Sequence, residues 1–203
     1  MQNEKLDVWK AQISAFHFPR WEELPEVDLY MDQVVGYLNQ KLSVFCGADE
    51  TETGQYITPT MINNYVKQKI IAAPVKKRYD RACLSALIVL FCAKQVLSIG
   101  MTGTLIACCR WREDPVCAYN RFCQIFEDVI HDTVTGTQNH IQTAKKSVED
   151  DMLTATAIAF INKNYVEKLL SAARSNTVLD KESAIAGNAS AADLSKTEGT
   201  VQA

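Results

Sequence analysis

The chain lacks the long hydrophobic runs that mark membrane and secreted proteins. Its most apolar uncharged stretch, residues 82–93, has 12 residues and ends at Lys94, whereas a membrane-spanning helix needs about 20. The N-terminal sequence MQNEKLDVWK is polar and has no apolar core of a signal peptide. We therefore expect a cytoplasmic protein that makes no membrane contact, with residues 82–93 forming a buried helix.

The residue patterns of catalytic and metal sites are also missing. The seven cysteines include no C-x-x-C pair, and Cys108 and Cys109 would point about 100° apart on a helix, so that with Cys117 and Cys123 they lack ligand spacing. The three histidines stand outside any H-E-x-x-H pattern or recognisable triad. The sequence predicts no enzyme, no metal and no cofactor, and it favours reduced, mostly buried thiols.

The net charge is small, but the charges are unevenly distributed along the chain. The hydrophobic fraction of 47% is sufficient for a packed core, and the net charge is only −3. Between Thr58 and Arg81, however, the sole acid is Asp80, against six basic residues: Lys67, Lys69, Lys76, Lys77, Arg78 and Arg81. This segment carries +5, which leaves −8 for the remainder of the chain. A positive stripe on an otherwise acidic protein suits a surface that faces phosphates.

Apolar residues recur every three or four positions along most of the chain, which is typical of helices. Helices are predicted at 4–16 and 27–45, and residues 47–55 are predicted to be an acidic loop. Potential helix caps at Thr58, Asp80, Ser98 and Asp114, two of them followed by proline, predict helices at 59–68, 82–96, 101–111 and 115–133. Between the first two, Ile70–Pro74 and Lys76–Tyr79 are predicted to pair as a short β-hairpin. Trp9, Trp21 and Tyr30 are expected to pack in the core or between helices.

A last helix is predicted at 138–174, after Gly136. Its apolar or small residues are spaced alternately by three and four positions, as in a coiled coil: Ile141, Val148, Met152, Ala155, Ala159, Val166, Leu169 and Ala173. Lys145 and Asn162 fall on the same seam. An antiparallel partner within the domain and a homodimer through this helix both remain open. Residues 175–203, rich in small and polar residues and without aromatics, predict a disordered tail.

Part of the chain resembles a known DNA-binding family. The MerR-type winged helix has a recognition helix that ends with tyrosines, two aliphatic residues and a proline, followed by a wing that returns through an arginine–tyrosine pair. The residues that match in order are Tyr65, Ile70, Ile71, Pro74, Arg78 and Tyr79. More closely, LPEVDLYMDQVV, ITPTMINNYVKQKII and APVKKRY resemble an uncharacterised bacterial domain-of-unknown-function family, number 1836, over 21–112. Asn63, Asn64 and Lys69 depart from the MerR pattern.

The resemblance implies a mainly all-α fold: a winged helix-turn-helix with a short β-hairpin wing, followed by a helical bundle or long-helix C-terminal part. The domains expected are an N-terminal helix (1–20), a winged-helix domain (21–112), a C-terminal helical region (113–174) and the tail (175–203).

The function predicted on this basis is that of a regulator of transcription that binds double-stranded DNA. Asparagine amides can pair with adenine, and a threonine can contact the thymine methyl group. The candidate DNA-binding residues are Thr60, Asn63, Asn64, Lys67, Lys69, Lys76, Lys77, Arg78 and Arg81. The alternative is a protein-interaction or small-ligand sensing module on a degenerate winged-helix frame, in which the basic stripe meets an acidic partner.

Overall fold

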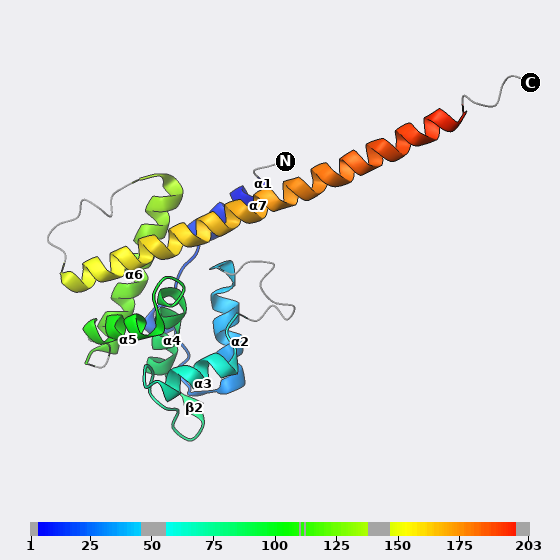
Figure 1. Cartoon of the computed structure of the whole chain (residues 1–203). Helices are drawn as coiled ribbons and strands as arrows, with labels where there is room; N and C mark the ends of the chain where they lie inside the picture. Colours follow the sequence, from blue (N-terminus) through cyan, green and yellow to red (C-terminus); the bar gives the residue numbers. More distant parts are fainter. Residues whose placement is uncertain (1–3, 46–55, 110, 112, 138–146, 198–203) are drawn as a thin grey trace, which may run out of the picture.

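The computed structural model describes residues 4–45, 56–109, 111, 113–137 and 147–197, and this part of the chain is mainly helical, as predicted. A long helix lies along one side of the body and extends beyond it. A hairpin, formed by residues 75–79, lies at the opposite, lower end (Figure 1). The helices are α1 (Glu4–Ser14), α2 (Met31–Lys41), α3 (Pro59–Lys67), α4 (Arg81–Ala93), α5 (Ile99–Cys108), α6 (Pro115–Thr135) and α7 (Val148–Thr197). Strands β1 (Leu29–Tyr30) and β2 (Arg78–Tyr79) form an antiparallel pair, and short 3-10 turns span Trp21–Glu23 and Ser43–Phe45.

Helix α4 lies at the centre of the core. All residues from Cys83 to Ala93 are buried, so the apolar stretch of the sequence is a core helix surrounded by other elements. No helix in the described residues has both the length and the apolar character needed to cross a membrane. Aromatic rings from four parts of the chain pack against one another, with centroid separations such as 4.1 Å for Phe122–Phe126 and 5.0 Å for Phe45–Phe160. These contacts join α6 and α7 to the N-terminal half.

The helix starts predicted from capping residues are confirmed. In each case the side-chain oxygen of the cap accepts a hydrogen bond from the backbone N–H three residues later, which satisfies a donor that the helix itself leaves unpaired. The caps and their distances are Thr58 (3.3 Å), Asp80 (2.8 Å), Ser98 (3.3 Å) and Asp114 (3.0 Å).

The start of α2 and the pairing of the hairpin differ from the prediction. Helix α2 begins at Met31 rather than near residue 27, because Leu29 and Tyr30 form β1, which pairs with β2 in the register Leu29↔Tyr79 and Tyr30↔Arg78. Residues 70–74 were expected to be the partner of the second hairpin strand, but only Val75 bridges to Arg78. Local periodicity does not encode a pairing between segments that lie so far apart in the chain.

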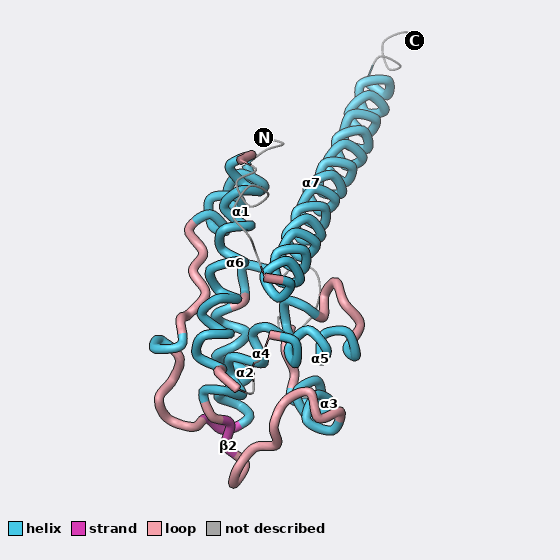
Figure 2. The backbone as a smooth tube through the Cα atoms, turned by 90° about the vertical axis from the view of Figure 1, so that its left-hand side faces the viewer, coloured by secondary structure: helices cyan, strands magenta, loops and turns pink. Residues whose placement is uncertain are grey.

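The C-terminal helix is longer than predicted. It continues to Thr197, through most of the segment expected to be disordered. Alanine is frequent there and has the highest helix propensity of all residues. Figures 1 and 2 show that the last part of α7 extends away from the body. The predicted acidic loop 47–55, and residues 138–146 and 198–203, lie outside the described residues.

Candidate functional site

Helix α3 exposes one polar face at the lower end of the molecule. Ile62 and Tyr65 are buried and attach the helix to the body, and burial raises the pKa of Tyr65 to about 12, so this hydroxyl stays neutral. The exposed side follows the spacing i, i+3, i+4 and i+7, which places its residues on one face of a helix. These exposed residues are Thr60, Asn63, Asn64 and Lys67, all of them predicted site residues.

The start of α3 is fixed by Asn39 of α2. Its Nδ2 donates to the carbonyls of Val35 and Ile57, each at 2.9 Å. Its Oδ1 accepts from the N–H groups of Tyr56 and Ile57, at 2.9 and 3.0 Å. One amide side chain therefore uses its donor and acceptor groups to hold residues 56 and 57, which precede α3, against α2. No motif or spacing in the sequence marks Asn39 for this role.

The end of α3 is a Schellman motif with a lysine at the position that usually holds glycine. The N–H of Ile70 donates to the carbonyl of Tyr65 (3.1 Å), and the N–H of Lys69 donates to the carbonyl of Val66 (2.9 Å). This pattern needs a left-handed residue after the helix, and Lys69 has φ +58°. Lys69 is exposed.

The hairpin turns at two further lysines in the left-handed region. Val75 and Arg78 exchange both backbone hydrogen bonds (3.0 and 2.9 Å) across Lys76 and Lys77, whose φ angles are +50° and +64°. Two-residue hairpin loops of this kind favour Asn-Gly or Gly-Gly, since each side chain is strained at positive φ. Both lysines are exposed at the tip.

Arg78 is held in place by Tyr30 on the neighbouring strand. The guanidinium lies 4.8 Å from the centroid of the Tyr30 ring, and its Nη2 donates to the Tyr30 hydroxyl at 2.8 Å. The expectation that Tyr30 packs in the core is wrong: 47% of its surface is exposed. A signal for this role was not available, because Tyr30 and Arg78 become neighbours only through the β1–β2 pairing.

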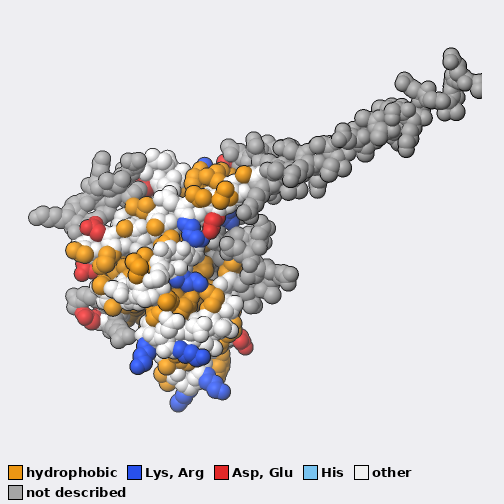
Figure 3. Space-filling model, viewed as in Figure 1, with side chains coloured by type: hydrophobic (Ala, Val, Ile, Leu, Met, Phe, Trp, Pro, Cys, Tyr) orange, Lys and Arg blue, Asp and Glu red, His pale blue; other side chains and the backbone are white. Residues whose placement is uncertain are grey.

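Arg81 is the one predicted site residue that lies apart from this surface. It is half-buried at the start of α4, where its Nε donates to the carbonyl of Pro25 (3.4 Å) and its guanidinium lies 5.9 Å from the Trp21 ring. The remaining eight residues occupy the exposed face of α3, the turn after it and the hairpin. Figure 3 shows Lys and Arg side chains gathered at this lower end. Exposed Asp28 and Asp32 flank β1 and limit the positive surface on that side.

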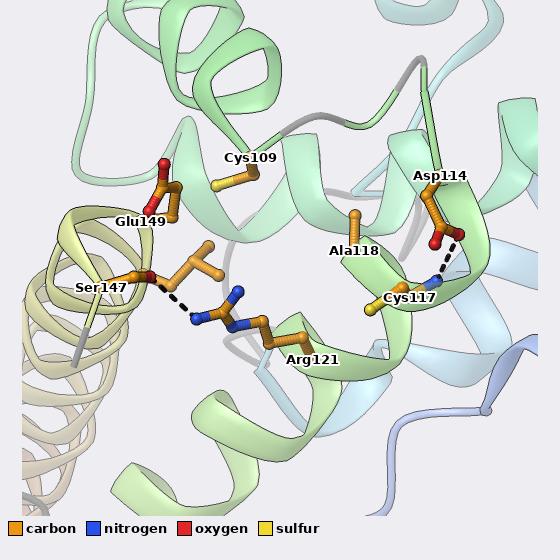
Figure 4. A pocket seen from close by; sticks show the side chains of 8 residues that line it. Cys109, Asp114, Cys117, Ala118, Arg121, Ser147 and Glu149 are labelled. Carbon is orange, nitrogen blue, oxygen red and sulfur yellow. Dashed lines mark hydrogen bonds between the residues drawn. The ribbon is translucent and has the colours of Figure 1, made fainter. Parts of the chain in front are cut away.

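A second feature, far from the hairpin, is a pocket of about 340 Å³ between α5, α6 and the start of α7 (Figure 4). Arg121 of α6 crosses it and donates to the hydroxyl of Ser147 (2.8 Å), and it also forms an ion pair with Asp150. The first of these contacts is drawn in Figure 4. The Arg121 guanidinium lowers the pKa of Asp150 and so keeps this carboxylate charged.

Thiols line part of the same pocket. Cys109 and Cys117 both lie on its wall, and burial raises the pKa of Cys109 to about 11, so this thiol is protonated at neutral pH. Among the described residues, no three His, Cys, Asp or Glu side chains come together as a set that could hold a metal ion.

Comparison with known proteins gives one match. The family model described as a domain of unknown function, DUF1836, matches residues 19–122, which include β1, α2, α3, the hairpin, α4 and α5. No curated protein and no solved structure matches the chain.

Proposed function

The chain belongs to the DUF1836 family, and we propose that it is a cytoplasmic transcriptional regulator that binds double-stranded DNA through α3 and the basic hairpin. The order α2, α3, hairpin and α4, with β1 paired to β2, supports the winged helix-turn-helix that the MerR resemblance implies. Helix α3 would be the reading helix and the hairpin would be the wing.

The observation that carries the proposal is the identity of the residues at positive φ. In the described part of the chain, the only non-glycine residues with positive φ are Lys69, Lys76 and Lys77. Such a backbone conformation costs a non-glycine residue on the order of 1–3 kcal/mol. All three are exposed lysines. The local backbone favours glycine at each position, so lysine there adds three positive charges at the cost of backbone strain, which supports a role in binding phosphate.

The contacts would divide between bases and backbone. Asn63 and Asn64, exposed on α3, can each pair with the N6 and N7 edge of adenine in the major groove. Lys76, Lys77 and Arg78 would contact phosphates beside the groove, and these contacts fix orientation without reading sequence. Arg78 enters this role already oriented, because Tyr30 holds one edge of its guanidinium.

The test is fluorescence anisotropy with a duplex from the region upstream of the protein's own gene and with a scrambled duplex. Each would be titrated at about 50 and 200 mM salt, a range over which phosphate-driven affinity falls steeply. If three or four lysine and arginine side chains contact phosphates, log K should fall with log salt at a slope of about −3 to −4. Asn63→Ala should reduce the difference in affinity between the upstream and the scrambled duplex, while the slope of log K against log salt stays unchanged.

The sharpest variant is Lys76→Asn/Lys77→Gly, because Asn-Gly is the preferred sequence for such a hairpin turn. It removes two charges while keeping the turn. It should weaken binding to both duplexes alike and reduce the magnitude of the slope of log K against log salt by about 2. Lys10→Ala/Lys41→Ala is the matched control, since it removes two charges from α1 and from the end of α2. Unchanged binding of the Asn-Gly variant would reject DNA binding by this surface.

A second candidate function, small-ligand sensing, is favoured by the pocket of Figure 4, whose volume of about 340 Å³ is within the usual range for small-molecule sites. Thermal unfolding in the presence of a metabolite library would test it. A compound that raises Tm in the wild type and not in Cys117→Trp, which would fill the pocket from its exposed wall, supports a ligand site. The absence of any DNA shift together with such a compound would favour this alternative.

A further inference from the structure

Helix α7 carries two different apolar stripes. The first faces the body: Leu153, Ala157, Phe160 and Ile161 are buried, and α6, α4 and α1 all contact the helix. Asn164 lies on the same side, where its amide donates to the carbonyl of Phe160 (2.8 Å). This stripe accounts for the docking of α7 onto its own chain.

The second stripe lies on the opposite side of α7. Its members are spaced by 4, 3, 4, 3, 4, 3 and 4 residues, the heptad pattern of a coiled coil: Val148, Met152, Ala155, Ala159, Asn162, Val166, Leu169 and Ala173. At 100° per residue, this stripe is turned about 180° from the buried one. Val148, Val166 and Leu169 are 71%, 51% and 41% exposed, and of the eight residues only Met152 is partly covered. The coiled-coil seam predicted from the sequence is therefore this second, outer stripe, and it is not the stripe that contacts the body.

We propose that the outer stripe of α7 is a dimer interface that pairs antiparallel with the same stripe of a second copy of this chain. The heptad places Val148, Ala155, Asn162 and Leu169 at d positions and the other four at a positions. With the two-fold axis between residues 160 and 161, each d residue faces an a residue of the second copy. The facing pairs would be Val148 with Ala173, Met152 with Leu169, Ala155 with Val166, and Ala159 with Asn162.

The sizes of the facing residues match in this register. Three of the four pairs place an alanine against a larger side chain, so the seam alternates small and large residues across the axis and the two helices can approach closely. The fourth, Met152 with Leu169, places two long apolar side chains together. The seam of 26 residues is about 38 Å long at 1.5 Å per residue. The body of each copy would lie on the outer side of the helix pair, because the buried stripe faces away from the axis.

The charge at the start of the seam favours the antiparallel orientation. The first turn of α7 holds Glu149, Asp150 and Asp151, and of these Asp150 is paired with Arg121 of the same chain. Lys163 is likewise paired with Glu167 of the same helix (2.5 Å). A parallel pair would bring Glu149 and Asp151 of both copies to one end of the seam, whereas an antiparallel pair places them at opposite ends.

Asn162 is the one strongly polar residue on the seam. In the antiparallel register the two Asn162 side chains lie on either side of the axis, offset by three residues or about 4.5 Å along it. At that separation the two amides can hydrogen-bond to each other. A single polar residue inside an apolar seam fixes the register, since any shift by a heptad increases the distance between the two amides.

A charge-exchange experiment tests both the interface and its orientation. Sedimentation equilibrium of the full chain should give twice the mass of the 22.7 kDa chain. Ala155→Glu and Val166→Lys alone should each raise the dimer dissociation constant by at least tenfold, because each buries a charge against an apolar partner. The double variant Ala155→Glu/Val166→Lys should restore the dimer, because the introduced carboxylate of one copy then faces the introduced ammonium group of the other.

Three results would overturn the proposal. A wild-type monomer at tens of micromolar would exclude the dimer, and single variants that remain dimeric would exclude this seam. Single variants that dissociate with a double variant that dissociates further would exclude the antiparallel orientation, since a parallel pair faces like charges in both layers. Ser171→Lys, an exposed position turned away from the seam, is the matched control and should stay dimeric. Unchanged circular dichroism of the single variants would show that the exposed substitutions leave the fold intact.

Discussion

Two helices of this chain end in the left-handed conformation, and they use different residues to do so. Helix α6 ends at Gly136, with φ +73°, whereas α3 ends with Lys69, with φ +58°. A Cβ at Gly136 would meet no atom within 4 Å, so backbone strain alone accounts for the glycine. The same strain acts on Lys69 and is tolerated. The comparison teaches that the backbone conformation alone does not decide which residue stands at the end of α3.

Replacing the three lysines at positive φ with glycine, as at the end of α6, or with asparagine should have the largest effect on stability and on duplex affinity. Lys69→Gly/Lys76→Asn/Lys77→Gly should raise the free energy of unfolding by about 1–3 kcal/mol in total, because the strain relieved at three positions is partly offset by the larger conformational entropy of glycine in the unfolded chain. The same variant should lose about two to three orders of magnitude in duplex affinity at ~0.1 M salt, because three phosphate contacts are removed. Urea denaturation and anisotropy on one preparation would measure both. A variant that gains stability and still binds normally would contradict the role of these lysines.

The reverse exchange should separate stability from binding. Gly136→Lys should lower the free energy of unfolding by about 1–2 kcal/mol, the cost of a left-handed conformation for a residue with a side chain. Duplex affinity should stay unchanged, since Gly136 follows α6, far from the hairpin (Figure 1). Gly136→Asn is the control and should lose less stability, because asparagine tolerates this conformation better. A loss of duplex affinity in proportion to the loss of stability would show that the two ends are coupled.

A smaller effect is expected at Tyr30, which orients Arg78. Tyr30→Ala should weaken duplex binding several-fold, because a cation–π contact of this kind contributes about 0.5–1 kcal/mol. Tyr30→Phe keeps the ring and loses only the hydroxyl acceptor, so it should bind with intermediate affinity. Anisotropy at fixed salt ranks the three proteins. Equal affinities of wild type and Tyr30→Ala would mean that Arg78 needs no support from the ring.

The smallest effect concerns pH at the α6–α7 end. The folded-state pKa of Asp150 lies below its ordinary value of 3.8, because Arg121 stabilises the carboxylate. This contribution is therefore present above pH 3.8 and is lost as the pH falls through the lower, folded-state pKa. The pair is partly exposed, so its contribution is about 0.2–1 kcal/mol. Asp150→Asn should show a smaller drop in Tm between pH 5 and pH 3 than the wild type. An identical drop in the two proteins would mean that protonation of Asp150 does not contribute to the loss of stability in acid.

The local features of the fold could be predicted from the sequence, whereas the distant pairings could not. The caps at Asp80 and Ser98 depend on residues within one helical turn, and both were predicted correctly. The β1–β2 pairing joins Tyr30 to Arg78 across two helices, α2 and α3, and no local pattern signals it. The exposed side of α3 followed from its periodicity, but the left-handed conformation of Lys69 did not, because sequence patterns place glycine or asparagine there.

The four hydrogen bonds of Asn39 have a consequence for tolerance to insertion. They fix residues 56 and 57 against α2, so the position of α3 does not depend on the length of the chain between residues 46 and 55. Doubling the length of a chain connection costs only about 0.6 kcal/mol. We therefore expect that a purification tag or a fluorescent reporter can be introduced between these residues without displacing α3.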